Sequence, residues 1–162
     1  SGARPGDVVL VTGPCGGSAA GLRELRAGNG SGSPHAVAAY RRPVARLREG
    51  ASARSGGAHA MIDVSDGLAL DLHRLADASG VGFELAAVPV ADGATEDEAL
   101  GGGEDYELIV ALRPRDAGVL AARFASEGLG HPVVIGTIVS EVARRTLRGH
   151  PLERMGWQHR VG

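Results

Sequence analysis

Residues 61–68, MIDVSDGL, bring two aspartates and a serine within four consecutive positions. Apolar residues before them indicate a short buried strand, and apolar residues at helical spacing from Leu68 onward indicate a helix. Asp63, Ser65 and Asp66 therefore lie where a strand passes into a helix. Capping of the helix N–H groups explains one such residue. It does not explain Asp63, which stands among apolar residues and would be costly to bury without a partner. The alternative is a hard-oxygen site suited to Mg²⁺ beside a phosphate.

Two glycine-rich segments are further candidates for chemistry. In residues 101–108, GGGEDYEL, three glycines allow a close backbone approach, and Glu104 and Asp105 stand at the mouth of a strand. A solvated loop is the competing interpretation. Residues 12–21, TGPCGGSAAG, have the outline of a phosphate cradle before a helix. They match neither common nucleotide-binding glycine motif, so we favour close backbone packing there.

The remaining reactive side chains suggest no site. The six histidines have no metal-binding spacing; we expect His73 on a helix surface and His150 and His159 in an irregular tail, and assign them no role. The single cysteine, Cys15, excludes an internal disulfide framework and fits a reducing compartment.

The elements that must position these residues alternate along the chain. Apolar runs predict strands over residues 6–13, 60–64, 81–90, 106–112 and 131–140. Helices are predicted over 67–78 and 114–128, and residues 14–28 are predicted to form a glycine-rich turn and a short helix that ends near Gly28. A weaker Arg-rich helix is predicted in 45–58, and one helical turn in the acidic loop 91–105. Residues 29–44 are typical of an exposed linker, and the polar tail 145–162 has one anchor, Trp157. This pattern predicts an α/β or α+β domain with a mixed sheet and packed helices.

Composition narrows the function classes. The chain has 162 residues, which suits one domain, and a net charge of −2, which gives no basic footprint for nucleic acid. It contains no lysine, which excludes a lysine nucleophile and a Walker loop. No apolar run is long enough to span a membrane. We therefore expect a soluble, cytoplasmic protein without nucleic-acid or membrane partners.

Taken together and in order, these stretches resemble the C-terminal domain of thiamine-monophosphate kinase, a family in the superfamily of aminoimidazole ribonucleotide synthetase. The resemblance covers nearly the whole chain: PGDVVLVTG, GGSAAGL, RRPVARLREG, AMIDVSDGLALDL, GGGEDYEL and the closing GW-x-H. DVSDGL occurs with variations in several members of the superfamily, whereas GGEDYEL is far more specific.

The resemblance implies the α+β fold of that C-terminal domain and transfer of the γ-phosphoryl group of ATP to thiamine phosphate. By this similarity Asp63 and Asp66 would hold Mg²⁺, and Ser65 would contact ATP. Glu104 or its neighbour Asp105 would contact thiamine phosphate, as would Trp157. Because aspartates place the cations that neutralise two phosphate groups, this chemistry needs no lysine or nucleophile triad.

The resemblance also implies a partner domain. Members of the family carry an N-terminal domain with most of the nucleotide site, which we expect to be missing from this chain, and the full-length enzyme is expected to be a homodimer. Ala45 stands before Arg46 where the family often has proline. The terminal cysteine of the hydrogenase-maturation dehydratases is absent. The alternative function is a stand-alone ligand- or metal-binding module without turnover.

Overall fold

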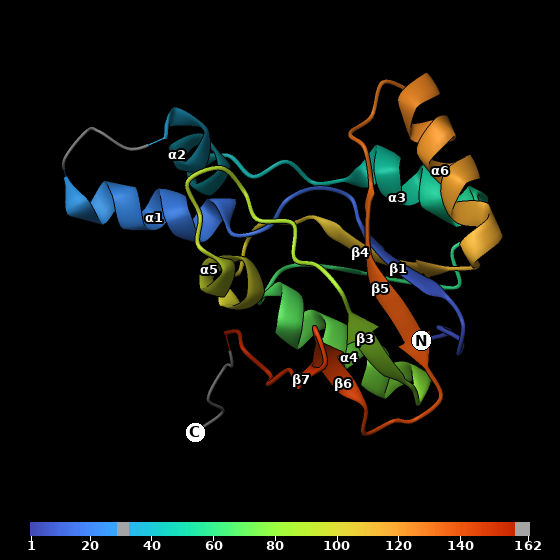
Figure 1. Ribbon diagram of the computed structural model, residues 1–162. Coiled ribbons are helices and arrows are strands. Elements are labelled where there is room, and N and C mark those ends of the chain that lie inside the picture. Colours follow the sequence, from blue (N-terminus) through green and yellow to red (C-terminus); the bar gives the residue numbers. More distant parts are fainter. Residues whose placement is uncertain (29–32, 158–162) are drawn as a thin grey trace.

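The computed structural model describes residues 1–28 and 33–157, which form one sheet with helices packed around it (Figure 1). The strands, in the order β2-β4-β1-β5-β3-β6-β7, form a seven-stranded sheet. They are β1 (Val8–Val11), β2 (Ala60–Asp63), β3 (Gly82–Leu85), β4 (Leu108–Leu112), β5 (Val133–Val139), β6 (Arg145–Leu147) and β7 (His150–Pro151). The helices are α1 (Gly17–Ala27), α2 (Pro34–Arg41), α3 (Leu47–Ser55), α4 (Leu68–Ser79), α5 (Glu96–Gly101) and α6 (Pro114–Ser126).

The sheet is mixed, as the sequence predicted. β1 lies between β4 and β5 and is antiparallel to both, while β3 and β6 are parallel. β2 stands at one edge and pairs only with β4. The five strands predicted from apolar runs are confirmed, although each is shorter than its apolar run because its ends enter loops.

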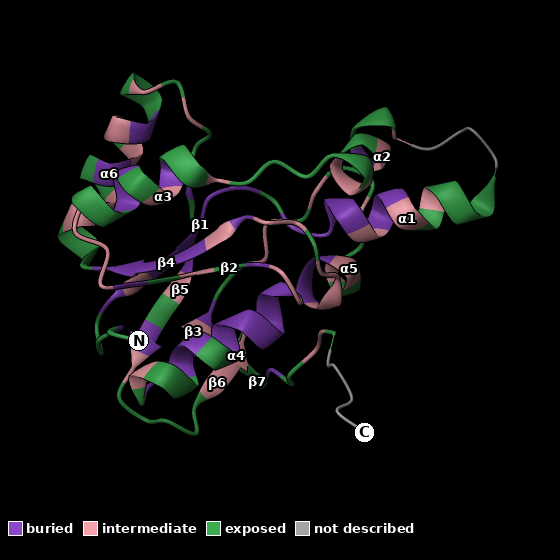
Figure 2. Cartoon of the chain, turned by 180° about the vertical axis from the view of Figure 1, so that it is seen from behind, coloured by how far each residue is buried: buried purple, intermediate pink, exposed green. Residues whose placement is uncertain are grey.

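Helices cover both faces of the sheet, and alternate residues of the strands supply the two cores. Val9 and Val11 of β1 pack in the core beneath α4, whereas Leu10 joins the core beneath α3 and α6. Figure 2 shows the buried side of α4 facing the strands and the buried residues of α3 and α6 on the opposite face. The period of two along β1 therefore fixes which side chains each layer receives.

The remaining helices, α1, α2 and α5, gather at the end of the sheet away from α3 and α6 (Figure 1). α1 and α2 approach closely at Gly21, where an added Cβ would lie 2.1 Å from the carbonyl oxygen of Ala36. The prediction of an exposed linker over residues 29–44 is thus wrong for Pro34–Arg41, and residues 29–32 lie outside the described residues. Pro34 occupies the first turn of α2, where proline is well tolerated.

Residues 145–157 of the C-terminal tail pack along α4, which corrects two further predictions. Part of the tail expected to be irregular forms β6 and β7. His73, expected on a helix surface, is buried because this tail covers it; its Nε2 donates to the carbonyl oxygen of Leu152 at 2.9 Å. Burial lowers the pKa of His73. His159 lies outside the described residues. Within the described part of the chain, no helix has the length and apolar character needed to cross a bilayer.

Candidate functional site

The strand-to-helix junction is held by an aspartate that the sequence analysis missed. Asp71, in the first turn of α4, is 1% exposed, and its Oδ2 accepts hydrogen bonds from the backbone N–H groups of Ser65 (3.0 Å) and Asp66 (2.9 Å). Arg74 Nη1 donates to Asp71 Oδ1 at 2.6 Å and also to Asp66 Oδ2. In the sequence, Asp71 looks like any polar residue on the surface of the predicted helix. Only the folded structure shows that its side chain is buried against the junction.

The capping interpretation of this junction is wrong. The N-cap of α4 is Gly67, with φ 126°, and no side chain caps the helix. Asp63 has apolar neighbours in the sequence but is exposed on the edge strand β2, so its charge is not buried. The side chain of Asp63 forms no hydrogen bond or ion pair with the other described residues. Its carboxylate therefore remains accessible to a ligand.

The GGGED segment lies directly against this junction. The backbone N–H of Glu104 donates to Ser65 O at 2.9 Å, and that of Tyr106 donates to Val64 O at 2.9 Å. Gly103 makes this approach possible, because an added Cβ would lie 2.5 Å from Ser65 O. The two motifs singled out in the sequence, more than thirty residues apart, thus form one backbone-linked unit.

Two residues of this segment adopt unusual backbone angles. Glu104 has φ 66° and Tyr106 has φ 53°, in the left-handed region that favours glycine. For a residue with a Cβ this conformation costs about 1–2 kcal/mol. Such angles persist only where the surrounding contacts hold them.

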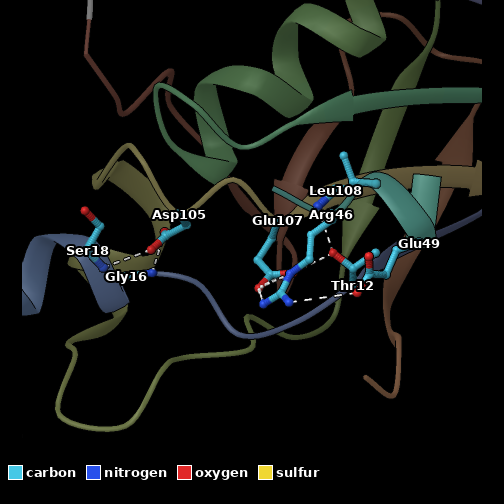
Figure 3. Close-up of polar contacts among 8 residues, drawn as sticks. All are labelled: Thr12, Gly16, Ser18, Arg46, Glu49, Asp105, Glu107 and Leu108. Atoms are coloured by element: carbon cyan, nitrogen blue, oxygen red, sulfur yellow. Dashed lines mark hydrogen bonds and ion pairs between the residues drawn. The ribbon is translucent and has the colours of Figure 1, made fainter. Parts of the chain in front are cut away.

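Asp105 points toward Gly16 and Ser18 at the start of α1, and Glu107 points toward Arg46, which precedes α3 (Figure 3). The carboxylate of Asp105 accepts hydrogen bonds from the N–H groups of Gly16 (2.6 Å) and Ser18 (3.0 Å) at the start of α1. Burial raises the pKa of Asp105, although these two hydrogen bonds act in the opposite direction. Asp105 therefore caps a helix. The glycine-rich turn at residues 12–21 packs closely against the chain, because a Cβ on Gly16 would lie 2.7 Å from the backbone nitrogen of Ala99.

Glu107 lies in a buried polar network that the sequence analysis did not find. It is 4% exposed and forms an ion pair with Arg46, which donates from both Nε and Nη2. Thr12 Oγ1 donates to Glu107 Oε2 at 2.6 Å and accepts from the N–H of Leu108 at 2.8 Å (Figure 3). The one signal in the sequence was a charged residue, Glu107, within the otherwise apolar strand predicted over residues 106–112.

Two pockets lie on opposite sides of residues 104–107. The first, which we call the Trp157 pocket, has a volume of about 590 Å³. Its lining consists of Ser18, Ala19, Leu22, Tyr40, Ser65, Asp66, Gly102, Gly103, Glu104, Tyr106 and Trp157. The second, the Arg46 pocket, has a volume of about 440 Å³ and includes Arg42, Arg46, Asp92, Asp105 and Glu107 in its lining.

The C-terminal tail closes one side of the Trp157 pocket. The N–H of Trp157 donates to Asp66 O at 2.8 Å, and the N–H of Leu70 donates to Met155 O at 3.1 Å. Gly156 has φ 154°, and an added Cβ would lie 2.5 Å from Asp66 O. The tail is thus attached to the strand-to-helix junction through backbone groups, and the indole of Trp157 remains 65% exposed.

The structure brings together four of the six residues that the sequence analysis proposed for the site. Ser65, Asp66, Glu104 and Trp157 line one pocket, whereas Asp105 lines the other and Asp63 lines neither. Within residues 1–28 and 33–157, no three His, Cys, Asp or Glu side chains are grouped in a way that would hold a metal ion. Asp63 and Asp66 supply the carboxylate oxygens that Mg²⁺ accepts together with phosphate oxygens and water.

A mixed sheet with helices on both faces, with two acidic loops beside a pocket, defines an α+β domain with a candidate binding site. The chain belongs to the family described as AIR synthase related protein, C-terminal domain, whose sequence profile matches residues 4–146.

Curated relatives narrow the comparison further. Thiamine-monophosphate kinase from Methanospirillum hungatei is 35% identical over 164 residues, covering 98% of this chain and 51% of the relative. The protein of that name from Halobacterium salinarum is 38% identical over 169 residues, covering 98% of this chain and 55% of the relative. The chain therefore spans about half the length of the curated relatives it matches.

Solved structures agree with this assignment. The structure of AaThiL complexed with AMPPCP and TMP superposes with a TM-score of 0.82 at 29% identity, covering 98% of this chain and 53% of the other. Thiamine-monophosphate kinase from Stenotrophomonas maltophilia gives 0.81 at 27% identity, covering 93% and 52%. Escherichia coli HypE, with a TM-score of 0.71 at 22% identity and coverage of 98% and 51%, shares the fold.

Proposed function

We propose that the full-length protein containing this chain transfers the γ-phosphoryl group of ATP to the phosphate of thiamine phosphate, forming thiamine diphosphate and ADP. The observation that carries the proposal is the Trp157 pocket, where Ser65, Asp66, Glu104 and Trp157 converge from separate parts of the sequence. The names of the matched relatives and the AMPPCP and TMP bound to AaThiL support this substrate pair.

The pocket suits the rings of thiamine. Thiamine carries a cationic thiazolium and a flat pyrimidine, and an exposed indole such as that of Trp157 attracts a cation over its face. Glu104, exposed on the same pocket, adds a negative charge. We assign the substrate contact to Glu104 rather than Asp105, because the carboxylate of Asp105 is directed toward α1.

The phosphate side of the reaction is assigned to the strand-to-helix junction. Ser65 would contact ATP, and Asp63 and Asp66 would hold Mg²⁺, which when bound neutralises the phosphate charges. The exposed Asp63 suits this role. Asp66 also has a competing cation, Arg74.

This chain would supply one part of a larger site. Its relatives are about twice as long. Among the described residues, the side chains at the junction are too few to bind a metal ion together with the phosphate groups of both substrates. We therefore infer a second, N-terminal domain that completes the nucleotide site, and a homodimer as the assembled enzyme. The use of ATP favours a cytoplasmic location.

The test is a coupled assay of the full-length protein with ATP, Mg²⁺ and thiamine phosphate, following ADP and thiamine diphosphate. We expect turnover with thiamine phosphate and none with thiamine, which lacks the acceptor phosphate. The 162-residue chain alone should show no turnover, because positioning dominates phosphoryl transfer. If the full-length protein bound thiamine phosphate without forming ADP, the proposal would give way to a binding module.

A further inference from the structure

Alternate residues of the segment 104–107 face different pockets. Glu104 and Tyr106 line the Trp157 pocket, whereas Asp105 and Glu107 line the Arg46 pocket. The segment is therefore the wall between the two pockets.

The wall cannot hold this shape through local preference alone. Glu104 and Tyr106, on either side of Asp105, both have left-handed φ values although neither is glycine. A non-glycine residue adopts that conformation only when surrounding contacts impose it. On the junction side, those contacts are the backbone hydrogen bonds from Glu104 and Tyr106 to Ser65 and Val64.

On the opposite side, the side chain of Asp105, the residue next to Glu104 in the sequence, holds the segment to the start of α1. Its two carboxylate oxygens are used separately: Oδ2 accepts from Gly16 N and Oδ1 from Ser18 N. Burial raises the pKa of Asp105, because these surroundings disfavour the charged form. Glu107, two residues further on, is held by Arg46 and Thr12.

We propose that Asp105 is a positioning residue that ties the loop to the start of α1 and thereby directs Glu104 into the Trp157 pocket. The identity of the ligand there, thiamine phosphate, rests on the proposed function. Asp105 acts through Glu104, because its own side chain lines the Arg46 pocket and accepts from the backbone N–H groups of Gly16 and Ser18 at the start of α1. Asparagine at position 105 keeps the shape but turns an N–H₂ donor toward one of these two N–H groups.

The kinetic test compares variants of the full-length protein. Asp105→Asn should raise KM for thiamine phosphate about tenfold and leave KM for ATP within about twofold. Asp92→Asn is the matched control: Asp92 lines the same Arg46 pocket but is exposed, and its side chain forms no hydrogen bond or ion pair with the other described residues. It should leave both constants unchanged.

A double-mutant cycle separates positioning from general damage. In a Glu104→Gln background, Asp105→Asn should add no more than about a twofold change, because its effect passes through the missing carboxylate. A full tenfold effect in that background would overturn the inference. Asp105→Glu keeps both acceptor oxygens and should give an intermediate KM, so the inference stays testable if the asparagine variant does not fold.

Hydrogen exchange tests the same inference without activity. Asp105→Asn should speed exchange at the backbone N–H groups of Glu104 and Tyr106 about tenfold, while the amides of β1 and β4 exchange as before. Unchanged exchange in the loop would refute the positioning role. If the unmodified protein had no kinase activity but the loop exchanged faster in the variant, only the proposed function would be wrong.

Discussion

Substitution of Asp71 by asparagine tests the contact that fixes the strand-to-helix junction. Asp71 is 1% exposed and accepts three hydrogen bonds, two from backbone N–H groups and one from Arg74. An amide retains one acceptor oxygen, so at least one of the two sets of donors meets an N–H₂ group instead. Hydrogen bonds to a charged group contribute about 1.5–3 kcal/mol each. We therefore expect Asp71→Asn to lower the free energy of unfolding by about 1.5–3 kcal/mol.

The assay is urea unfolding of the 162-residue chain followed by circular dichroism. Asp63→Asn is the matched control, because Asp63 belongs to the same junction but is exposed, and the described contacts give it no partner. Its free energy of unfolding should change by less than about 0.5 kcal/mol. A loss below about 0.5 kcal/mol for Asp71→Asn, or an equal loss for both variants, would refute the role of Asp71.

Three further predictions concern the site and the tail. In the full-length protein, Asp63→Asn and Asp66→Asn should each lower kcat about a thousandfold with the fold intact, and near-normal turnover at limiting Mg²⁺ would contradict the metal assignment. Trp157→Ala should raise KM for thiamine phosphate about five- to thirtyfold with little change for ATP, whereas equal losses for both substrates would mark a structural anchor. Burial lowers the pKa of His73, so between that pKa and about 6.5 the unfolded chain binds more protons and stability falls as the pH falls. Urea unfolding across that window should show a weaker pH dependence in His73→Gln, and an unchanged dependence would exclude His73 as its source.

The sequence predicted the layers of the fold better than the arrangement of its loops. Apolar runs located the main strands, because a strand between two helical layers must be apolar on both faces. The sequence predicts a linker where α2 lies, because glycine, serine, asparagine and proline cluster in residues 29–44. The position of α2 depends on close packing against Gly21, which no local pattern reveals.

The site could be predicted in part for similar reasons. Motifs and resemblance indicated Ser65, Asp66, Glu104 and Trp157, and the structure places them on one pocket. The choice between Glu104 and its neighbour could not be made, because it depends on left-handed backbone angles that only the folded surroundings impose. Asp71 was missed because an aspartate on the exposed face of a helix and a buried aspartate that accepts hydrogen bonds cannot be told apart in the sequence.

The division of residues 104–107 between two pockets has a consequence for how such a domain can change over time. Substitutions at positions 104 and 106 change the lining of the Trp157 pocket directly, whereas a substitution at position 105 reaches that pocket through the backbone of the segment. Inserting or deleting a single residue within the segment would change which side chains face each pocket. The length of this segment and the acidic residues at positions 105 and 107 are therefore constrained together, and libraries of fixed length should retain more folded members when they vary positions 104 and 106 only.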